Sequence, residues 1–494
     1  MSLADIAVVG AYFAAILLLG TVFCRQQKSL REYFLGSRNI PWWAAACSGI
    51  ATMASAVGYL GAPGQAFKSD LSYLQLRLGV LPVMAIICLL LIPFFYRLEV
   101  YTAYEYLEKR FDLKTRLLAG TLFMLLKCFY LGIVIYAPAI VVTQMTGLPL
   151  PWVILATGAV TTFYTMLGGM RAVIWTDSLQ LGVLMAGVAA AVWTILSRVD
   201  GGLARVFEVA HAEGKLKVLD FSTSLHTEFT VWGGLLGGTF FMLAQYGVDQ
   251  AELQRFLTTS SIRNSRRAII STLIVTSIYG TVLFLLGSAL YVFYLQHPEK
   301  NGLAVNPDRV FPKFIIEELP VGVRGLVIAG IFAAAMSTVS SVLNSLTTVT
   351  LSDFYQRLSG KSGTVRLARM VTAGIGALGT SIAFYGESFG GILVASGRIS
   401  NFFGGSLAGI FLLGMLSKRA NGTGAFLGAL CGFAGVAALS AFTTVSWVWH
   451  AVFSAATAMI MGSLLSRLFA PPPETKLRGL VRGMRAPQQE EVRK

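Results

Sequence analysis

A hydroxyl-rich run, Ser-Thr-Val-Ser-Ser at 337–341, lies within an apolar stretch and is the first candidate for chemistry in this sequence. The helical spacing i, i+3, i+4 and i+7 places on one face the residues Ala334, Ser337, Thr338 and Ser341. Their neutral oxygens suit Na⁺, which transporters bind partly through the carbonyls of broken helices. The alternative is that the hydroxyls bond to their own helix or to neighbouring helices.

A second stretch, residues 48–58, interrupts an apolar segment with small residues (Ser-Gly-Ile-Ala-Thr-Met-Ala-Ser-Ala-Val-Gly). Transporter helices are often broken near the bilayer midplane at such places. A break around Ala51 to Ala54 would supply carbonyl oxygens to the hydroxyl face.

Asp177 lies near the start of another apolar segment. Ionisable groups inside a membrane are costly, so each one suggests a function. Asp177 can bind a second cation or a proton. Alternatively, it forms a solvated pair with Arg171 in the interface.

Three cations also fall inside apolar segments, namely Arg77, Lys127 and Arg398. Lys127 and Arg398 lie too far from the segment ends to reach the interface easily. Few acids accompany them, so a substrate anion is a plausible partner, and arginine binds a carboxylate through its two-pronged fork. An internal ion pair or a water-filled vestibule is the alternative for each.

The composition indicates the elements that position these residues. Of 494 residues, 55% are hydrophobic and 13% are charged, whereas a soluble domain has roughly 25% charged residues. A spanning helix needs about 20 apolar residues. The sequence predicts an all-α polytopic protein in the lipid bilayer with about 13 transmembrane helices, near 5–23, 44–66, 73–96, 116–145, 151–167, 173–197, 230–248, 267–295, 323–350, 367–384, 389–416, 423–442 and 446–469.

The net charge of +15 lies mostly in short loops between these segments. With the N-terminus outside and the C-terminus in the cytoplasm, the basic loops fall on the cytoplasmic side, as the positive-inside rule expects. No nucleic acid is therefore needed to explain the charge. We expect the tail from about residue 470 to be unstructured.

A second glycine-rich interruption, within 233–247, suggests two inverted repeats, each beginning with a broken helix. The predicted organisation has five regions: 1–43 with an extra N-terminal helix and loop, 44–198 and 230–416 as the repeats, 417–469 with two further helices, and 470–494 as the tail. The alternative is that these glycines only let helices approach closely.

Enzymatic chemistry is not expected. The sequence offers no nucleophile, base and acid in a recognisable constellation, no phosphate-binding loop and no metal-ligand spacing. The four histidines lie in or near external segments.

The sequence resembles the solute:sodium symporter family from the first apolar segment to Lys418-Arg419, most closely the branch of iodide, monocarboxylate and multivitamin symporters. The resemblance rests on an ordered set of motifs at 31–36, 132–138, 163–177, 245–250 and 335–341. It implies an amino-acid-transporter-type fold with five-plus-five inverted repeats, one helix before and two after them.

The resemblance also implies residue roles. The main Na⁺ site would comprise Ala51, Ala54, Ala334, Ser337 and Thr338. A second Na⁺ site would comprise Asp177, Ser340 and Ser341. The family's substrate pocket would comprise Met53, Ser55, Gly58, Arg77, Tyr130, Met242, Gln245, Ser400 and Asn401. The predicted substrate-binding set adds Lys127 and Arg398, on the basis of their charge within apolar segments.

Arg77 departs from the family pattern, and at Tyr130 the arginine of the sialic-acid branch is absent, which argues against that substrate. The resemblance implies a sodium-coupled importer of a small organic anion, such as a monocarboxylate or a carboxylate-bearing vitamin, working by alternating access in a bacterial inner membrane without need of an oligomer. A symporter of a sugar or zwitterion and a non-transporting membrane sensor stay open as alternatives.

Overall fold

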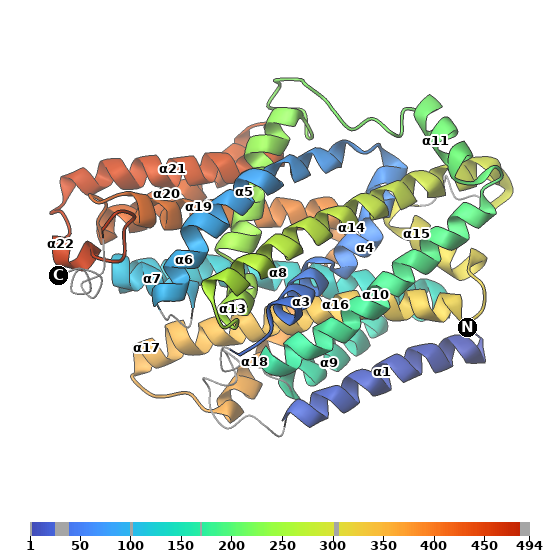
Figure 1. Cartoon of the computed structure of the whole chain (residues 1–494), viewed down its shortest axis with the longest axis horizontal. Helices are drawn as coiled ribbons and strands as arrows, with labels where there is room; N and C mark the ends of the chain where they lie inside the picture. The colour runs from blue at the N-terminus through green and yellow to red at the C-terminus, as the bar shows by residue number, and fades with distance from the viewer. Residues whose placement is uncertain (1, 25–38, 99–101, 168–169, 301–305, 485–494) are drawn as a thin grey trace.

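The computed structural model describes residues 2–24, 39–98, 102–167, 170–300 and 306–484. Helices make up nearly all regular structure in these ranges, where the one strand-like contact is an isolated bridge between Ile40 and Thr259. The predicted all-α class is confirmed (Figure 1).

Eight helical segments of the described chain are long and apolar enough to span a bilayer. They are η2 to α6 (Ser72–Leu98), α8 (Leu113–Thr146), α10 (Met170–Arg198), α14 (Ile262–Gln296), α16 to α17 (Val323–Ser359), α19 (Ile392–Leu416), α20 (Gly422–Phe442), and α21 with its flanking turns (Trp447–Leu468). Each coincides with a predicted segment.

A bent helix pair and two shorter apolar helices, Leu3–Leu19 and Leu150–Met166, match three further predicted segments. The segments predicted at 230–248 and 367–384 are not among these helices, so the number 13 is not confirmed. The remaining helices are α1 (Leu3–Cys24), α3 (Trp42–Met53), α4 (Ala56–Lys68), α5 (Val80–Ile86), α6 (Ile92–Leu98), α7 (Ala103–Arg110), α9 (Leu150–Leu167), α11 (Gly202–Ala212), α12 (Gly238–Met242), α13 (Gln250–Leu257), α15 (Pro307–Glu318), α16 proper (Val323–Val349), α17 (Gln356–Ser359), α18 (Val365–Ala383), α21 proper (His450–Leu465) and α22 (Glu474–Leu477).

The first predicted break is present between α3 and α4, whose axes differ by 52°. Ala54 leaves the helical conformation with φ −77° and ψ 48°, and Ser55 is extended and begins α4 as its N-cap. The Ser55 hydroxyl accepts a hydrogen bond from the Gly58 amide at 3.4 Å. The break leaves carbonyl groups of α3 without partners in their own helix.

The second glycine-rich segment combines close helix packing with a break at its end. Its first glycines lie in a π-helical turn, η4 (Gly233–Gly237), where a Cβ on Gly234 would lie 2.1 Å from the Gln75 carbonyl oxygen. These glycines therefore allow close helix approach, as the alternative reading held. The chain leaves the helix further on, at Val248, and Asp249 then caps α13 by accepting from the Ala251 amide at 2.9 Å.

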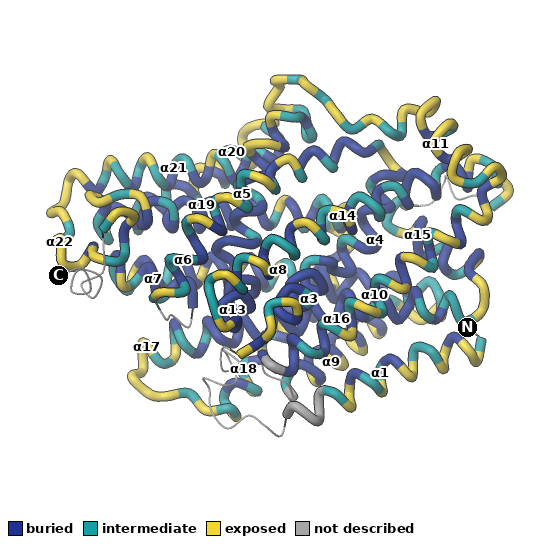
Figure 2. Tube along the Cα trace, viewed as in Figure 1, coloured by how far each residue is buried: buried dark blue, intermediate teal, exposed yellow. Residues whose placement is uncertain are grey.

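The helix α16 lies at the centre of the molecule and is buried along most of its length (Figure 2). It packs against α10, α8, α1 and α3, and α3 in turn packs against α10 and α14. The outermost of these helices, α1, is tied to the start of α16 because buried Asp5 accepts hydrogen bonds from Arg324 and from the Gly322 and Gly325 amides. The hydroxyl run on α16 therefore lies where several helices meet.

The expectation of an unstructured tail is wrong for residues 470–484. Leu477 and Val481 are buried, Lys476 Nζ donates to the Phe111 carbonyl, and Tyr106 donates to the Leu480 carbonyl at 3.2 Å. These contacts dock the segment on α7. The last ten residues, 485–494, lie outside the described chain.

Near the same end of the molecule a buried ion-pair group connects α7, α8 and the segment after α16, namely the π-helical turn η8 (Thr350–Tyr355) and α17. Arg116 donates to Asp353 and, at 2.8 Å, to Glu108. Thr102 donates to both Asp353 oxygens, and Arg357 donates to Glu108 at 2.7 Å. We call these five residues the Arg116 cluster.

Candidate functional site

The hydroxyls of Ser337 and Thr338 reach the carbonyls that the first helix break exposes. Ser337 Oγ donates to the Ala51 oxygen at 2.9 Å and contacts the Ala334 oxygen at 3.2 Å. Thr338 Oγ1 lies 2.9 Å from the Thr52 oxygen and 3.0 Å from the Ala334 oxygen. We call these two hydroxyls and three carbonyls the main oxygen cluster.

Each hydroxyl bonds to its own helix and to α3, as the packing alternative expected, and Na⁺ binding by the same groups stays a prediction. The prediction named the carbonyls of Ala51 and Ala54, and the hydroxyls bond to the carbonyls of Ala51 and Thr52. Ala54 is itself buried at the break. Turning of the two O–H groups would direct their lone pairs at an ion shared with the same carbonyls, the ligand type that Na⁺ takes at broken helices.

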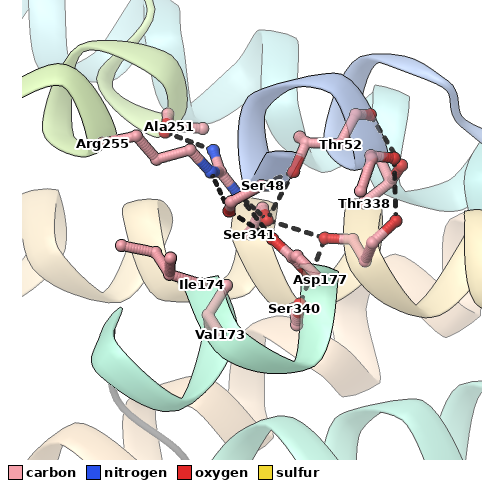
Figure 3. A network of polar contacts seen from close by, with 12 residues as sticks. Ser48, Thr52, Val173, Ile174, Asp177, Ala251, Arg255, Thr338, Ser340 and Ser341 are labelled. Atoms are coloured by element: carbon pink, nitrogen blue, oxygen red, sulfur yellow. Dashed lines mark hydrogen bonds and ion pairs between the residues drawn. The ribbon is translucent and has the colours of Figure 1, made fainter. Parts of the chain in front are cut away.

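Asp177 on α10 lies beside the Ser340 and Ser341 end of the hydroxyl run on α16, away from Thr338, as Figure 3 shows. It accepts a hydrogen bond from Ser48 Oγ at 2.6 Å, and Arg255 Nη2 approaches its Oδ2 at 3.4 Å. Asp177 and Arg255 are both 0% exposed. Asp177 is thus not a solvated interfacial residue, and the side chain of Arg171, its alternative partner, lies outside the described part of the chain.

Arg255 of α13 connects several elements at once. Its Nε donates to Ser48 Oγ and its Nη2 to Thr52 Oγ1, both at 2.7 Å, and Nη2 also bonds to Ser341 Oγ. Its Nη1 bonds to the Ala251 carbonyl and to Glu252 Oε1, the latter at 3.1 Å. We call the set Ser48, Thr52, Asp177, Glu252, Arg255 and Ser341 the Arg255 cluster.

Two carboxylate oxygens in the Arg255 cluster, Asp177 Oδ1 and Glu252 Oε2, are buried and have no hydrogen-bond partner among the described residues. A buried anionic oxygen without a partner is costly. The predicted second-site hydroxyls lie close by and bond back to the Ser337 carbonyl, Ser340 at 3.1 Å and Ser341 at 2.6 Å. The structure therefore brings all three predicted second-site residues to one region.

Most predicted pocket residues line one cavity of about 100 Å³. They come from the first break and the start of α4, from η2 (Ser72–Gly79), α8 and α12, and from η5 (Leu243–Gly247), and comprise Met53, Ser55, Gly58, Arg77, Tyr130, Met242 and Gln245. A smaller cavity of about 30 Å³ shares Met53, Tyr130 and Gln245 with it and is also lined by Thr52, Thr338, Lys127 and Ser400. The two cavities thus lie between the Arg77 side chain and the main oxygen cluster.

Arg77 is half-buried in the larger cavity. Its guanidinium lies against Gly280 of α14, where a Cβ would be 2.7 Å from Nη2. No ion pair or hydrogen bond of Arg77 occurs within the described residues. An unneutralised guanidinium facing a cavity within the membrane is a suitable partner for a carboxylate.

The other two membrane cations have protein partners. Lys127 forms a buried ion pair with Asp249, and its Nζ lies 5.2 Å from the centre of the Tyr130 ring. Arg398 is more than half exposed and lies 3.5 Å from Glu228. Asn401 is buried and donates to the Trp447 carbonyl at 3.2 Å. The internal-pair alternative therefore describes Lys127, and Asn401 does not line the 100 Å³ cavity.

Arg398 lines an open vestibule of about 570 Å³, together with Lys68, Arg309, Asp308 and Glu387. Burial raises the pKa of the Asp308 carboxyl above its usual value, although the Ile392 amide donates to it at 3.1 Å. Leu393 lines both the vestibule and the Arg77 cavity. The vestibule is therefore adjacent to the cavity and offers a path towards it.

The sequence interpretation missed Arg255, Glu252, Ser48 and Thr52 as functional candidates. A signal was present, because Glu252 and Arg255 are spaced i, i+3 directly after the second interruption. Residues at that spacing face the same side of a helix. Which side of α13 meets Asp177 cannot be derived from spacing alone.

Comparison with known proteins gives a consistent result. A model of the sodium:solute symporter family matches residues 33–432. The sodium/sialic acid symporter SiaT of Proteus mirabilis is 32% identical over 95% of this chain and 96% of its own. The human sodium/iodide cotransporter is 32% identical over 83% of this chain and 64% of its own.

Solved structures agree. A Na⁺-coupled sialic acid symporter in a substrate-bound outward-open state matches with a TM-score of 0.87 and 32% identity, covering 95% of this chain and 99% of that one. The nucleobase-cation-symport-1 transporter Mhp1 matches with a TM-score of 0.59 and 16% identity, over 90% and 97% of the two chains. The second match concerns the fold alone.

Proposed function

This chain belongs to the sodium:solute symporter family, as the motifs predicted, and from that premise we propose that it imports a small organic anion together with Na⁺. Its family consists of sodium-coupled membrane transporters and not of enzymes, which argues against the sensor alternative. The anionic substrate class, the ion sites and the direction of transport are the proposal.

The observation that carries the proposal is that one helix break serves both sites. The carbonyls of Ala51 and Thr52 belong to the main oxygen cluster, and Met53 and Ser55 line the cavity that holds Arg77. An ion bound to these carbonyls would fix the conformation of the break. It would thereby shape the cavity, which is how binding at one site raises affinity at the other.

Arg77 would bind the substrate carboxylate through its fork. Its guanidinium has no competing carboxylate within the described residues, unlike Lys127 and Arg398. The proposed main Na⁺ site therefore keeps its predicted members Ala51, Ala334, Ser337 and Thr338 and gains the Thr52 carbonyl. The repeats 44–198 and 230–416 and the cytoplasmic C-terminus remain part of the proposal.

A second candidate substrate is a carboxylated sugar such as sialic acid. Two relatives at 32% identity over 93% or more of this chain are sodium/sialic acid symporters. Position 130 carries a tyrosine in place of the arginine expected for that substrate, but Tyr130 lines the same cavity as Arg77. A carboxylate could therefore be bound from the Arg77 side of the cavity.

The test of sodium coupling uses purified protein in proteoliposomes. A panel of monocarboxylates, carboxylated vitamins, sialic acid, neutral sugars and amino acids is first screened by thermal shift with and without Na⁺. Uptake of the best ligand by Ser337→Ala/Thr338→Ala should lose its sodium stimulation. The control Ser345→Ala removes a buried hydroxyl of the same helix that bonds to the Val342 carbonyl. Unchanged sodium dependence in the double variant would refute the main site.

The test of the anion uses Arg77→Gln, with Arg398→Gln as the matched control. Loss of binding of anions, with neutral ligands unaffected, would support the carboxylate role of Arg77. Equal loss of neutral and anionic ligands would favour the alternative of a sugar or zwitterion carrier.

A further inference from the structure

Arg255 contacts the oxygens proposed for a second sodium ion. Its Nη2 bonds to Ser341 Oγ and approaches Asp177 Oδ2, two of the three residues of that site. The same guanidinium also reaches Ser48 and Thr52 on α3. A positively charged group of the protein thus lies among ligands suited to a cation (Figure 3).

The charges in this region do not balance. Arg255 and Lys127 face the carboxylates of Asp177, Glu252 and Asp249, and the first two acids each keep one oxygen without a hydrogen bond among the described residues. Lys127 and Asp249 neutralise each other. With all three acids ionised, one negative charge remains on Asp177 and Glu252 together, and such a buried net charge is strongly unfavourable.

We propose that Arg255 is a tethered cation that exchanges with Na⁺ at the second site, moving from Asp177 towards Glu252 when the ion binds. This inference rests on the proposed function, since it concerns regulation of the same ion sites. The ion would take the oxygens of Asp177 and of Ser340 or Ser341. Its single charge would balance the remaining negative charge.

The geometry provides a place for the displaced guanidinium. Arg255 Nη1 already lies 3.1 Å from Glu252 Oε1, and the neighbouring Oε2 is unpartnered within the described chain. A small rotation of the side chain would convert this single contact into a two-pronged arginine–carboxylate pair. Glu252 and Arg255 share the short helix α13, so the exchange needs no movement of a distant element.

The exchange has a consequence for affinity. Because Arg255 occupies the site in most molecules, only the remaining fraction can bind the second sodium ion. The apparent sodium affinity of the site is the intrinsic affinity multiplied by that fraction. The same competition helps to expel the ion on the low-sodium side of the membrane. Sodium release, which a tight site would slow, is thereby kept fast.

The experiment measures binding of radioactive sodium to the purified full-length protein, with choline chloride holding the ionic strength constant. In Arg255→Gln the second ion should bind at a sodium concentration about tenfold lower than in the native protein, if Arg255 occupies the site nine-tenths of the time. Maximal uptake should fall because release is slowed. A guanidinium with only a structural role predicts the opposite change, weaker sodium binding.

Arg116→Gln is the matched control, because it also removes a buried guanidinium from an Asp and a Glu without touching the ion sites. It should lower stability without tightening sodium binding. Arg255→Lys keeps the charge but loses the fork, and should bind sodium with intermediate affinity.

Asp177→Asn/Arg255→Gln distinguishes the two roles even if the single variant folds poorly. Exchange predicts that the double variant binds one ion fewer than the native protein, whereas an Asp177–Arg255 pair at which no ion binds predicts native sodium binding. Native binding in the double variant, or weaker binding in Arg255→Gln, would overturn the exchange. The proposed function would still stand if Ser337→Ala/Thr338→Ala abolished sodium stimulation.

Discussion

Two buried arginines, Arg255 and Arg116, each lie between an aspartate and a glutamate and near a threonine hydroxyl, yet their surroundings differ. In the Arg116 cluster, Asp353 and Glu108 accept hydrogen bonds on all four oxygens, and Arg357 supplies a second positive charge. In the Arg255 cluster one oxygen of each acid has no partner among the described residues, and the acids outnumber the arginine.

The difference teaches how to separate a structural ion pair from a site that can take another ion. A closed cluster with balanced charge gains nothing from a further cation, whereas an open cluster with a net negative charge does. Location agrees with this distinction. The Arg255 cluster shares Thr52 with the main oxygen cluster, and the Arg116 cluster joins α7, α8 and the segment after α16.

The largest effect is expected for Asp177→Asn. It should remove the second sodium ion and reduce the slope of sodium activation from about two towards one. It should also lower the unfolding free energy by about 3 kcal/mol, because Arg255 loses an acidic partner in a buried site. Sodium binding and thermal unfolding in detergent measure the two effects, and retention of both ions would contradict the comparison.

Asp353→Asn tests the closed cluster. Since Arg116 loses a buried partner there, we expect a similar loss of about 3 kcal/mol in stability. Sodium binding should be unchanged in number and affinity. A lost sodium ion in this variant would mean that the two clusters do not differ in the way described.

Thr52→Val tests how the Arg255 cluster connects to the main oxygen cluster. It removes the hydroxyl that bonds to Arg255 and Ser341 but keeps the carbonyl that Thr338 contacts. Stability should fall by about 1 kcal/mol, the typical value of one hydrogen bond. Sodium affinity at the main cluster, measured in an Asp177→Asn background, should stay within about twofold. A larger change would show that the clusters share more than the backbone.

The smallest expected effect is on the pH dependence of stability, through Glu108, which lies outside the spanning helices. Burial alone raises the pKa of Glu108, but hydrogen bonds from Arg357 and Arg116 outweigh it and lower the pKa below its usual value of 4.5. Its stabilising contribution is therefore complete above pH 4.5 and is lost on acidification through the lowered pKa. Since Glu108 is partly exposed, Glu108→Gln should only slightly reduce the fall of the melting temperature with acidification below pH 4.5. An unaltered pH dependence of the melting temperature in this variant would contradict the pairing.

Several features follow from local sequence and were predicted correctly. The apolar segments indicate the eight long helices within a few residues, and the small residues at 48–58 indicate the break between α3 and α4. The spacing of Ser337 and Thr338 places both on the face that meets α3. Helix periodicity and chain length carry such information because they depend on neighbouring residues.

The tertiary structure alone decided which charges meet. Ser48 and Arg255 are 207 positions apart, and Asp177 and Arg255 are 78 apart. The direction of α13 after Val248 brings the guanidinium to Asp177, and the direction of η2 leaves Arg77 facing a cavity without an acid among the described residues. Ion pairing in a membrane depends on three-dimensional distance and burial. The sequence therefore determines where the proposed Na⁺ ligands lie along the chain, and the packing of distant helices determines which charged groups meet them.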